Sequence, residues 1–200
     1  MDDEGRTQLF NGVDLSGWRM AGPGHFDVED GVLVSHGGMG LLWYTAEPCG
    51  DCVLRVVYRT GRVEDNSGVF IRIDGPPADA WHAVHHGYEV QIFAPGDDYH
   101  ATGVIYSMSK ALSRPDAPPG EWNTMEITLD GELVRITLNG RLVTEFDPAG
   151  DVPERAETYE PERGPRPTHG YLGLQNHDEP SRVEFREVSI GPLPDSKGSA

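Results

Sequence analysis

The stretch GEWNTMEITLDGELVRITLNGRLV, residues 120–143, decides the fold class of this chain. Apolar Ile127 and Leu129 alternate with polar residues, and the same alternation continues over 133–138. A period of two is typical of strands that bury one face. Asp130-Gly131 and Asn139-Gly140 separate the apolar runs, and such dipeptides favour type I′ turns, whose central residues need positive φ. The stretch therefore predicts three antiparallel strands joined by two tight turns, in an all-β protein.

Short runs of this kind recur along the chain, separated by turn signals such as Asp30-Gly31. We expect strands at 26–28, 32–35, 41–44, 52–60, 68–73, 88–93, 102–106, 123–129, 132–138, 142–145, 171–176 and 182–190. No segment longer than about ten residues has the apolar spacing of a helix. Many short strands without helices imply two packed antiparallel sheets, in a jelly-roll sandwich.

The length of 200 residues, with 25 glycines and 16 prolines, suits one large β domain with many turns. Neither a repeat nor a linker divides the chain, so we expect a single domain over 1–191 and a disordered tail over 192–200. The segment 146–169 is rich in Glu, Pro and Arg and has no apolar period. Loops of this length are functional lids or mobile segments, and we expect a lid whose end with Arg163, Arg166 and His169 forms one wall of the binding cleft while its acidic middle moves over it.

The net charge is −17, because 33 acidic residues face 16 basic ones. Phosphate binding needs a basic patch, so neither a nucleic acid nor an anionic membrane is an expected partner. No apolar run approaches the ~20 residues of a membrane span. The start Met1-Asp-Asp-Glu lacks the basic and then apolar segment of a secretory signal, so the protein either stays inside the cell or has lost a leader. The oligomeric state is left open.

Cys49 and Cys52 form a C-x-x-C pair that leads into an expected strand rather than a helix. A thioredoxin-like site would need the pair at the start of a helix, and a zinc site would need two further ligands. A turn with small buried or bridged thiols is the favoured interpretation.

Seven segments, in the same order along the chain, resemble motifs of the DUF1080 family, also called 3-keto-disaccharide hydrolase domains. They are LFNGVDLSGW (9–18), NSGVFIR (66–72), YEVQ (88–91), TGVIY (102–106), GEWN (120–123), LNG (138–140) and GLQNH (173–177). Each segment is weak alone, but together they span nearly the whole chain. One position departs from the family pattern, because Asn176 stands where the family usually has Asp before His.

The resemblance implies a concanavalin A-like jelly roll of two curved antiparallel sheets, with a sugar-binding concave face. It also implies action on glycosides whose C3 hydroxyl has been oxidised to a ketone, so that a 3-keto sugar is the expected partner. The choice of substrate is the least transferable part of this resemblance, because the long loop and the histidine-rich segment of this chain look individual.

Strand alternation sorts the residues that can carry chemistry. In the strand expected at 68–73, Arg72 lies on the face opposite to the aliphatic Val69. In the strand at 88–93, Glu89 and Gln91 likewise point away from Val90. Since the aliphatic faces meet the core, we expect Arg72, Glu89 and Gln91 together on the concave face. On spacing alone, an ordinary ion pair between Arg72 and Glu89 on an exposed sheet face is the alternative.

A ketone at C3 of the sugar would explain why a glutamate, an arginine and a histidine are needed in one site. The carbonyl acidifies the proton on C2, so a base can remove it, the C1 substituent can leave, and water can add back. The route needs a base, a cation or donors at the enolate oxygen, and an acid for the leaving group. We expect Glu89 to be the base, Arg72 to stabilise the enolate, and His177 to donate to the leaving oxygen or to act as the alternative base.

Further residues are expected to bind the substrate. Amide side chains match sugar hydroxyls, a tyrosine offers a hydroxyl, and aromatic rings stack on sugar rings. The candidates are Asn66, Gln91 and Gln175 as amides, Tyr106 as the hydroxyl, and Trp81, Trp43 and Tyr99 as rings. A turn at 66–68 and core packing of Tyr106 are the alternatives, and Trp18 and Trp122 are expected to be structural.

A divalent ion could stabilise the negative charge of the enolate oxygen in place of arginine. We expect the segment 74–87 to be a solvated surface loop first, a substrate rim second and a metal site third. Glu89, His177 and the histidines of this loop are conceivable ligands, but the rings of His85 and His86 point apart because the residues are adjacent. We assign no metal ligand and no cofactor, with a divalent cation as the open alternative. The chain has neither a Gly-x-Ser-x-Gly elbow nor a Gly-x-Gly-x-x-Gly fingerprint, so the oxidation that makes the ketone is expected from a separate enzyme.

The predicted activity is hydrolase or lyase-type cleavage of 3-keto-glycosides by C2 deprotonation, β-elimination and hydration. A non-catalytic carbohydrate-binding module on the same fold is the first alternative. A glycosidase with two carboxylates is the second, and it would need another carboxylate ~5–9 Å from Glu89. The sequence offers Asp97, Asp98 and Glu121 for that position.

Overall fold

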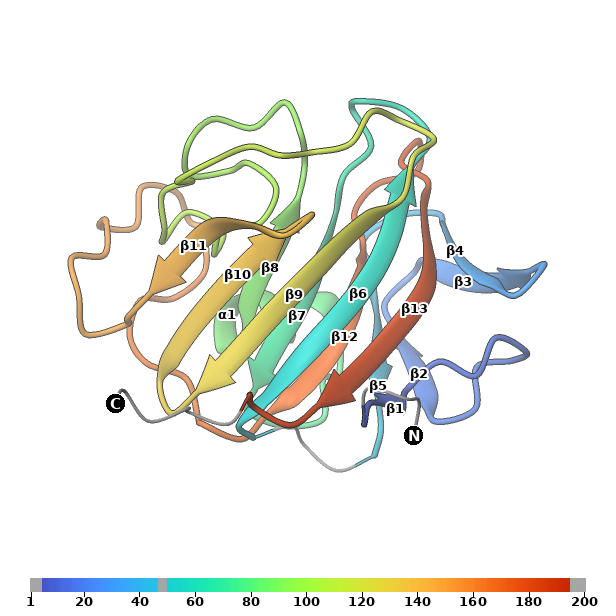
Figure 1. The fold of residues 1–200 in the computed structure, drawn as a ribbon, viewed down its shortest axis with the longest axis horizontal. Coiled ribbons are helices and arrows are strands. Elements are labelled where there is room, and N and C mark those ends of the chain that lie inside the picture. Colours follow the sequence, from blue (N-terminus) through green and yellow to red (C-terminus); the bar gives the residue numbers. More distant parts are fainter. Residues whose placement is uncertain (1–4, 47–49, 195–200) are drawn as a thin grey trace.

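The computed structural model describes residues 5–46 and 50–194, and it places their strands in two antiparallel sheets. Figure 1 shows the larger sheet in front and the smaller sheet behind it. The larger sheet runs β11 (Arg141–Phe146), β10 (Leu133–Leu138), β9 (Asn123–Asp130), β6 (Cys52–Thr60), β13 (Val183–Gly191), β4 (Val32–His36), β3 (His25–Glu29), and β1 (Thr7–Gln8) pairs with β13. The smaller sheet runs β2 (Trp18–Ala21), β5 (Gly40–Tyr44), β12 (Tyr171–Asn176), β7 (Ser67–Ile73), β8 (Tyr88–Ile92). The predicted all-β sandwich is confirmed.

The meander β9–β10–β11 has the predicted strands, and one of its turns is shifted by a residue. Leu138 pairs with Arg141, and both Asn139 and Gly140 have positive φ, which is the type I′ pattern. Asp130 instead pairs with Leu133, so that the first turn is Gly131-Glu132. Only Gly131 of that turn has positive φ, which is the pattern of type II′. The type I′ expectation for Asp130-Gly131 was therefore wrong.

The main core lies between the two sheets. Its side chains come from alternate positions of the facing strands, with Ile127, Leu129 and Ile136 from the larger sheet and Val69 and Val90 from the smaller one. All five are at most 1% exposed. Burial of one face of each sheet is the reason for the period of two in the sequence.

A second apolar cluster lies on the outer face of the smaller sheet, under helix α1 (Ala80–His86). Ala80, Ala83 and Val84 of the helix pack on a face that includes Phe70 and Ile73. Asp79 caps the helix by accepting a hydrogen bond from His82 N at 2.9 Å. The expectation that the segment 74–87 is a loop was wrong here, because a helix of two turns is too short to show apolar periodicity.

Two further differences concern strands. The short strands β1 and β2 were not predicted. The strand expected at 102–106 is absent, since this segment forms turns that touch β8 through a single bridge from Ile105 to Val90. The segment still bonds to the outer edge of β8, because Gly103 N donates to Gln91 O at 2.8 Å and Tyr106 N donates to Glu89 O at 2.9 Å.

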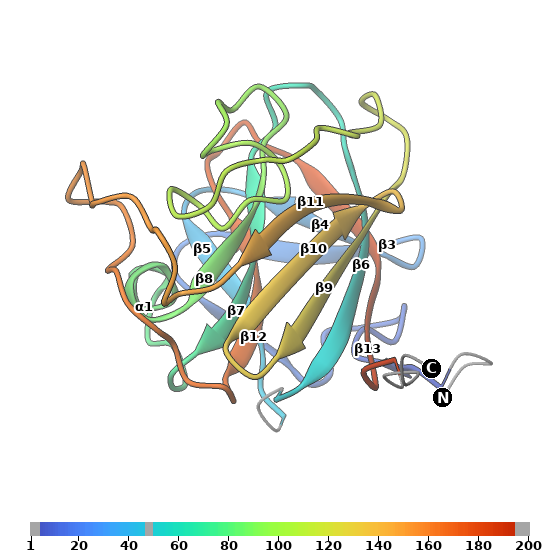
Figure 2. The ribbon, with the colours of Figure 1, turned by 60° about the vertical axis from the view of Figure 1, so that its left-hand side comes forward.

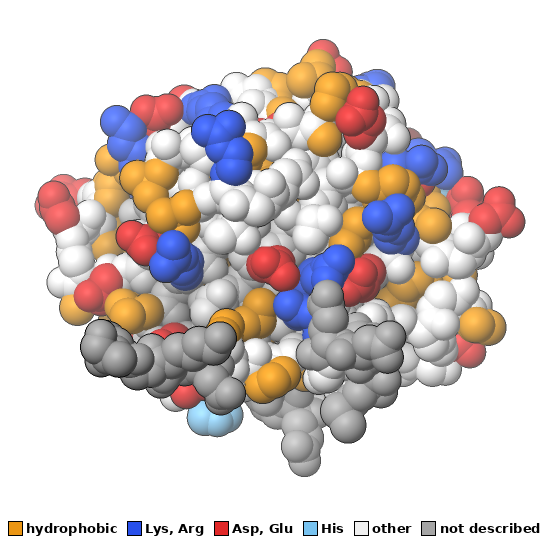
Figure 3. Space-filling view, viewed as in Figure 1, with side chains coloured by type: hydrophobic (Ala, Val, Ile, Leu, Met, Phe, Trp, Pro, Cys, Tyr) orange, Lys and Arg blue, Asp and Glu red, His pale blue; other side chains and the backbone are white. Residues whose placement is uncertain are grey.

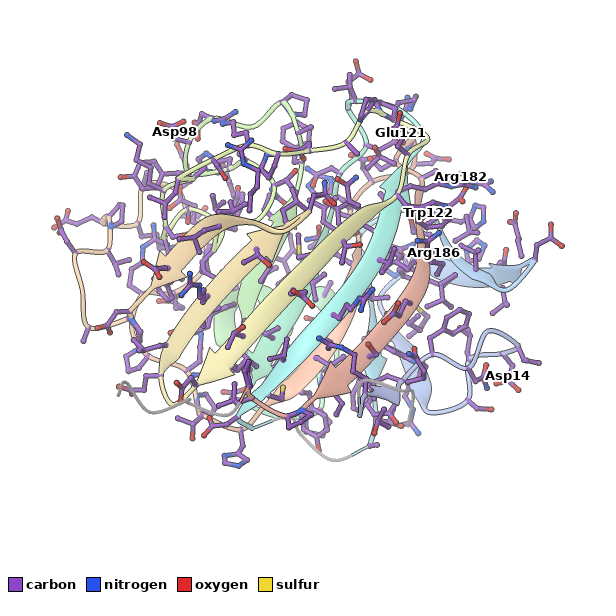
Figure 4. The ribbon with its side chains drawn as sticks, viewed as in Figure 1. Asp14, Asp98, Glu121, Trp122, Arg182 and Arg186 are labelled. Atoms are coloured by element: carbon purple, nitrogen blue, oxygen red, sulfur yellow. The ribbon has the colours of Figure 1, made fainter. Side chains whose placement is uncertain are left out.

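The outer face of the larger sheet carries charges of both signs, interspersed with apolar side chains (Figure 3). Trp122 lies on this side with Arg186, and the guanidinium carbon of Arg186 is 4.5 Å from the ring centroid (Figure 4). Arg59 approaches the same ring at 4.6 Å. Trp18 is buried, and its Nε1 donates to Leu9 O at 2.9 Å. Trp18 thus belongs to the core, as expected, whereas Trp122 is half-buried on the outer face and does not belong to the core.

Parts of some expectations lie outside the described residues. Cys52 is disulfide-bonded, whereas Cys49 lies outside the described residues, as do the last six residues of the expected tail. The helix among the described residues is too short and too polar to cross a bilayer.

Arg72 interrupts the regular alternation of β7. Its φ is +53°, and the register between β7 and β12 shifts between Tyr171 and Gly173, which marks a β-bulge. After the bulge, Ile73 lies with Phe70 in the outer cluster. The guanidinium of Arg72 donates to Gly131 O, in a turn of the opposite sheet. The bulge therefore turns Arg72 toward the larger sheet.

We expect Gly170→Ala to destabilise the protein, because a Cβ at Gly170 would lie 2.4 Å from Arg72 Cα and 2.5 Å from Arg72 C. Backbone atoms cannot move aside as a flexible side chain can, so a loss of ~1–3 kcal/mol is expected. Chemical denaturation measures the difference. Gly75→Ala is the matched control, since a Cβ there meets nothing within 4 Å, and it should change stability by less than ~0.5 kcal/mol. Equal effects of the two substitutions would contradict the account of the bulge.

Candidate functional site

A cavity of about 420 Å³ opens on the outer face of the smaller sheet, next to the part that α1 covers. Beyond the apolar residues under the helix, the same sheet face becomes polar. The structure brings seven of the predicted site residues to this cavity, namely Asn66, Trp81, Glu89, Gln91, Tyr106, Gln175 and His177, whereas Arg72, Trp43 and Tyr99 do not line it. Their roles there remain predictions.

Glu89 lies at the floor of the cavity, on β8, and faces the adjacent strand β7. Pairing of Gly68 with Gln91 and of Phe70 with Glu89 puts these four residues on one sheet face. A Cβ at Gly68 would come within 2.7 Å of Glu89 Oε1 and 2.9 Å of its Cγ. The absence of a side chain at Gly68 therefore provides the space in which the carboxyl group lies.

Burial determines the protonation of Glu89. The side chain is 8% exposed, and it has no salt bridge with a cation among the described residues. Desolvation raises the pKa of Glu89 to about 8, although a hydrogen bond from Gln175 opposes the rise. A carboxyl group with such a pKa is mostly protonated at neutral pH and becomes a stronger base than an exposed carboxylate once it ionises.

The amide side chains around Glu89 leave acceptors unused. Asn66 Oδ1 and Gln175 Oε1 are buried and have no hydrogen-bond partner among the described residues. The amide oxygen of Gln91 accepts from Ile92 N at 3.1 Å. Buried acceptors without a donor are costly, and a ligand with hydroxyl groups in the cavity would satisfy them.

Tyr106 adds a hydroxyl group to the cavity. Its ring packs against the ring of His100, which also lines the cavity, with the centroids 5.0 Å apart. Burial, together with the charge of Glu89, raises the pKa of Tyr106 to about 12. The phenol therefore keeps its proton at neutral pH and can donate a hydrogen bond to a ligand.

His177 is oriented by a neighbour that the sequence analysis did not single out. Its Nδ1 lies 2.9 Å from Asp178 Oδ2. Partial burial disfavours the ionised form of Asp178, but hydrogen bonds from Ser181 and His177 lower its pKa overall. A carboxylate at Nδ1 fixes the orientation of the ring, which leaves Nε2 for contact with a ligand. The adjacency of Asp178 to His177 was the available signal.

Two exposed aromatic residues form the rim. Trp81 of α1 is 48% exposed, and Tyr159 of the long loop is 54% exposed. The long loop lies alongside α1 (Figure 2). Arg166 of this loop donates hydrogen bonds to Gly87 O and to His85 O, each at 3.0 Å. Sequence reasoning missed Tyr159, because nothing distinguishes a loop aromatic until the backbone path is known.

The long loop differs in detail from its prediction. The cavity wall comes from Tyr159 in its middle, while Arg163 and Arg166 do not line the cavity and instead bind the loop to the rest of the protein. Arg163 donates to Ser107 Oγ at 3.1 Å and to Glu160 Oε2 at 2.9 Å. The basic end is therefore an anchor, and the expectation that it forms the wall was wrong.

Arg72 is the main correction among the catalytic candidates. It was expected beside Glu89, but the bulge turns its side chain to Gly131 O in the opposite sheet. Strand alternation could not reveal this, since a single residue with positive φ reverses the face of everything that follows it. Trp43 and Tyr99 also do not line the cavity, and Trp43 is buried in the cluster under α1.

The cavity does not gather a set of metal ligands. Among the described residues, the group of three Asp, Glu or His side chains with ligand atoms close enough for one ion is Asp27, Glu29 and His36, on the β3–β4 hairpin. Glu89 has a hydrogen bond from the amide of Gln175, and His177 is paired with Asp178, but within the described part of the chain these side chains do not form such a group of three.

The comparison with known families settles the relationship of this chain. The model of the 3-keto-alpha-glucoside-1,2-lyase-like domain matches residues 5–191. The chain belongs to this family. Comparison with curated proteins gives no match.

Solved structures agree with this family membership. A protein of Parabacteroides distasonis that is provisionally classed as a glycosyl hydrolase has a TM-score of 0.78 and 25% identity, over 97% of this chain and 98% of that one. A Bacillus subtilis protein of unknown function with a galectin-like fold has a TM-score of 0.68 and 15% identity, over 93% and 94%. The carbohydrate-binding module CBM66 of Bacillus subtilis has a TM-score of 0.55 and 16% identity, over 86% and 93%. The last two show a shared fold.

We expect Glu89→Gln to stabilise the fold in a pH-dependent way. A pKa raised from 4.5 to about 8 means that the native state holds the proton more tightly than the unfolded chain. The stability of the wild type therefore falls as pH rises from ~4.5 to ~8, by an amount on the order of a few kcal/mol. The amide introduced by the substitution stays neutral, so the difference in melting temperature should be small at pH 4.5 and grow until pH 8. Glu121→Gln, at an exposed position, should show no such trend.

Proposed function

We propose that the protein is a carbohydrate-active enzyme that cleaves 3-keto-glycosides by β-elimination followed by hydration. Family membership supports the reaction class, and the buried, uncharged carboxyl of Glu89 in an open cavity is the observation that carries the proposal. A carboxylic acid that is costly to ionise, and that faces a cavity rather than a cation, is a feature of catalytic acids and bases. A module that only binds sugar has no need of it.

In this proposal Glu89 removes the proton from C2 of the sugar. The C3 ketone makes that proton acidic, and the electron pair of the C–H bond passes into the enolate. A general base is most effective when its pKa lies near the working pH, because it is then partly ionised yet still basic. The raised pKa of Glu89 meets that condition, and Gln175 holds the carboxyl in place.

Neutral donors would stabilise the enolate oxygen, since Arg72 is turned away from the cavity. Tyr106 offers a phenol that keeps its proton, and Asn66 and Gln91 offer amide groups at the same cavity. Donors that are fixed before the reaction stabilise developing negative charge without reorganisation. The unused oxygens of Asn66 and Gln175 would accept from hydroxyl groups of the sugar.

His177, held by Asp178, would complete the elimination. As the enolate re-forms the ketone, the C1–O bond breaks and a double bond forms between C1 and C2. Protonated His177 gives its proton to the leaving oxygen. Water then adds at C1 and C2 regains a proton, so that the net result is hydrolysis. Each step balances without a redox cofactor.

A glycosidase with two carboxylates is the less favoured alternative. Such an enzyme needs a second carboxylate within ~5–9 Å of the first. Glu89 is the carboxylate that lines the cavity among the described residues. Asp98 pairs with Lys110 and Arg114, Asp97 pairs with His100, and Glu121 lies beside Trp122 (Figure 4).

The substrate test compares a 3-keto-glucoside with its parent glucoside. We expect release of the aglycone from the keto sugar and none from the parent, because only the ketone acidifies C2. Chromatography of the products measures both. Equal release from the two would support the glycosidase alternative, while sugar binding without release would support a binding module.

Glu89→Gln should lower kcat/KM for the 3-keto-glucoside by ~10²–10⁴, since the amide cannot accept the proton. In the wild type, kcat/KM should rise with pH and level off near the pKa of about 8. Gly68→Ala should also impair turnover, because its Cβ would meet the Glu89 carboxyl at 2.7 Å. Glu121→Gln is the control for turnover. A Glu89→Gln variant within threefold of the wild type would exclude Glu89 as the base.

A further inference from the structure

A second group of titratable side chains lies away from the cavity, on the β3–β4 hairpin. His25, Asp27 and Glu29 alternate along one face of β3, and His36 of β4 pairs with His25 across the hairpin. This face looks away from the core, because Phe26 and Leu33 occupy the buried face. Ligand atoms of Asp27, Glu29 and His36 all lie within 4.8 Å of one another.

Three distances in this group are close to those between the ligands of one zinc ion, and His25 reaches the group through Asp27 alone. His36 Nε2 lies 3.3 Å from Glu29 Oε1 and 3.7 Å from Asp27 Oδ2, and His25 Nε2 lies 3.5 Å from the same Asp27 oxygen. Tetrahedral zinc with bonds of ~2.0–2.2 Å holds neighbouring ligand atoms ~3.3–3.6 Å apart. Two of the three contacts fall in this range, and the third exceeds it by 0.1 Å.

The chemistry of these atoms suits a cation, and in its absence a hydrogen bond between His36 Nε2 and Glu29 Oε1 at 3.3 Å holds part of the group together. Two imidazole nitrogens face two carboxylate oxygens, and a neutral imidazole nitrogen without hydrogen presents a lone pair, as an oxygen does. Lone pairs that converge repel each other unless protons or a metal ion lie between them. Two imidazoles and two carboxylates form a ligand set that zinc binds readily.

We propose that Asp27, Glu29 and His36 bind zinc, and that the exposed side chain of His25, which lies next to Asp27 but outside this group, becomes the fourth ligand by a change of rotamer. The surrounding contacts orient the ligands, as outer contacts do in zinc sites. The two imidazole rings stack with centroids 5.2 Å apart and planes 19° apart. Arg182 holds Glu29 Oε2 at 2.9 Å and leaves Oε1 for the metal (Figure 4 labels Arg182 near the hairpin).

Asn176 fixes the open end of the hairpin. Its amide nitrogen donates to the backbone oxygens of both His25 and His36. The two histidine ligands are therefore tied to the end of β12, and the next residue along the chain is His177 of the cavity. This contact places the zinc site next to the candidate active site without sharing a residue with it.

A second histidine group in the same chain has a different geometry and serves as a matched control. His82 Nε2 lies 2.8 Å from Asp74 Oδ1, and His86 Nδ1 lies 3.2 Å from Asp74 Oδ2. Each ring thus meets its own oxygen of a single carboxylate, at distances that a hydrogen bond explains. We infer no metal site at this helix.

The test is calorimetric titration of the metal-free, full-length protein with zinc chloride, without reductant so that the disulfide at Cys52 persists. We expect one tight equivalent in the wild type, and a loss of affinity of more than ~100-fold in His36→Ala and in Asp27→Asn. The double variant His82→Asn/His86→Asn should bind as the wild type does. Cobalt bound at the same site should give the strong visible bands of tetrahedral geometry.

Three results would overturn the proposal: no tight equivalent in the wild type, a tight equivalent that survives His36→Ala, or one that disappears with the helix variant. Circular dichroism of the metal-free variants shows whether each is folded. His36→Gln keeps a side chain of similar length and replaces His36→Ala if the latter fails to fold. Zinc should also raise the melting temperature of the wild type and not that of the hairpin variants.

Discussion

The cost of burying one carboxyl group without a countercharge shapes the site. Glu89 is removed from water on a sheet face, and desolvation raises its pKa to about 8. The neighbouring strand makes room for it with Gly68, and Gln175 gives it a hydrogen bond. A cation at this point would hold the carboxylate ionised and lower its basicity. The bulge that turns Arg72 to the opposite sheet therefore leaves the carboxyl group of Glu89 without this cation beside it, as the proposed proton transfer requires.

The smaller sheet divides its outer face between two tasks. One part is apolar and is covered by α1, whose Ala83 and Val84 pack against Phe70 and Ile73. The other part carries Glu89, Gln91 and Gln175 and remains open as the cavity. The helix thus supplies both the hydrophobic cover that the fold needs and, through Trp81, part of the rim. At the boundary between these two parts, Val84 of α1 both packs in the apolar cluster and lines the cavity.

The sequence carried enough information for the sheets and for most of the cavity. Alternation with a period of two identified the strands of the core, and it placed Glu89 and Gln91 on one face because β8 is regular. It failed at Arg72, where one left-handed residue changes the face, and at α1, whose two turns are shorter than the helical period can reveal. The position of Tyr159 at the cavity could not be predicted, because it depends on the path of a long loop. Hydrogen bonds from arginines of this loop to distant backbone oxygens fix that path.

The segment that replaces the expected strand at 102–106 has a consequence for association between molecules. β8 is the last strand of its sheet, and a bare last strand offers its backbone groups to strands of other chains. Here Gln91 N donates to Val104 O at 3.0 Å, while Gly103 N and Tyr106 N occupy oxygens of β8. The turns at 102–106 are too irregular to form a strand edge with which another chain could pair. They protect the strand that carries Glu89 from β-aggregation, and they do so with a residue, Tyr106, that also faces the cavity.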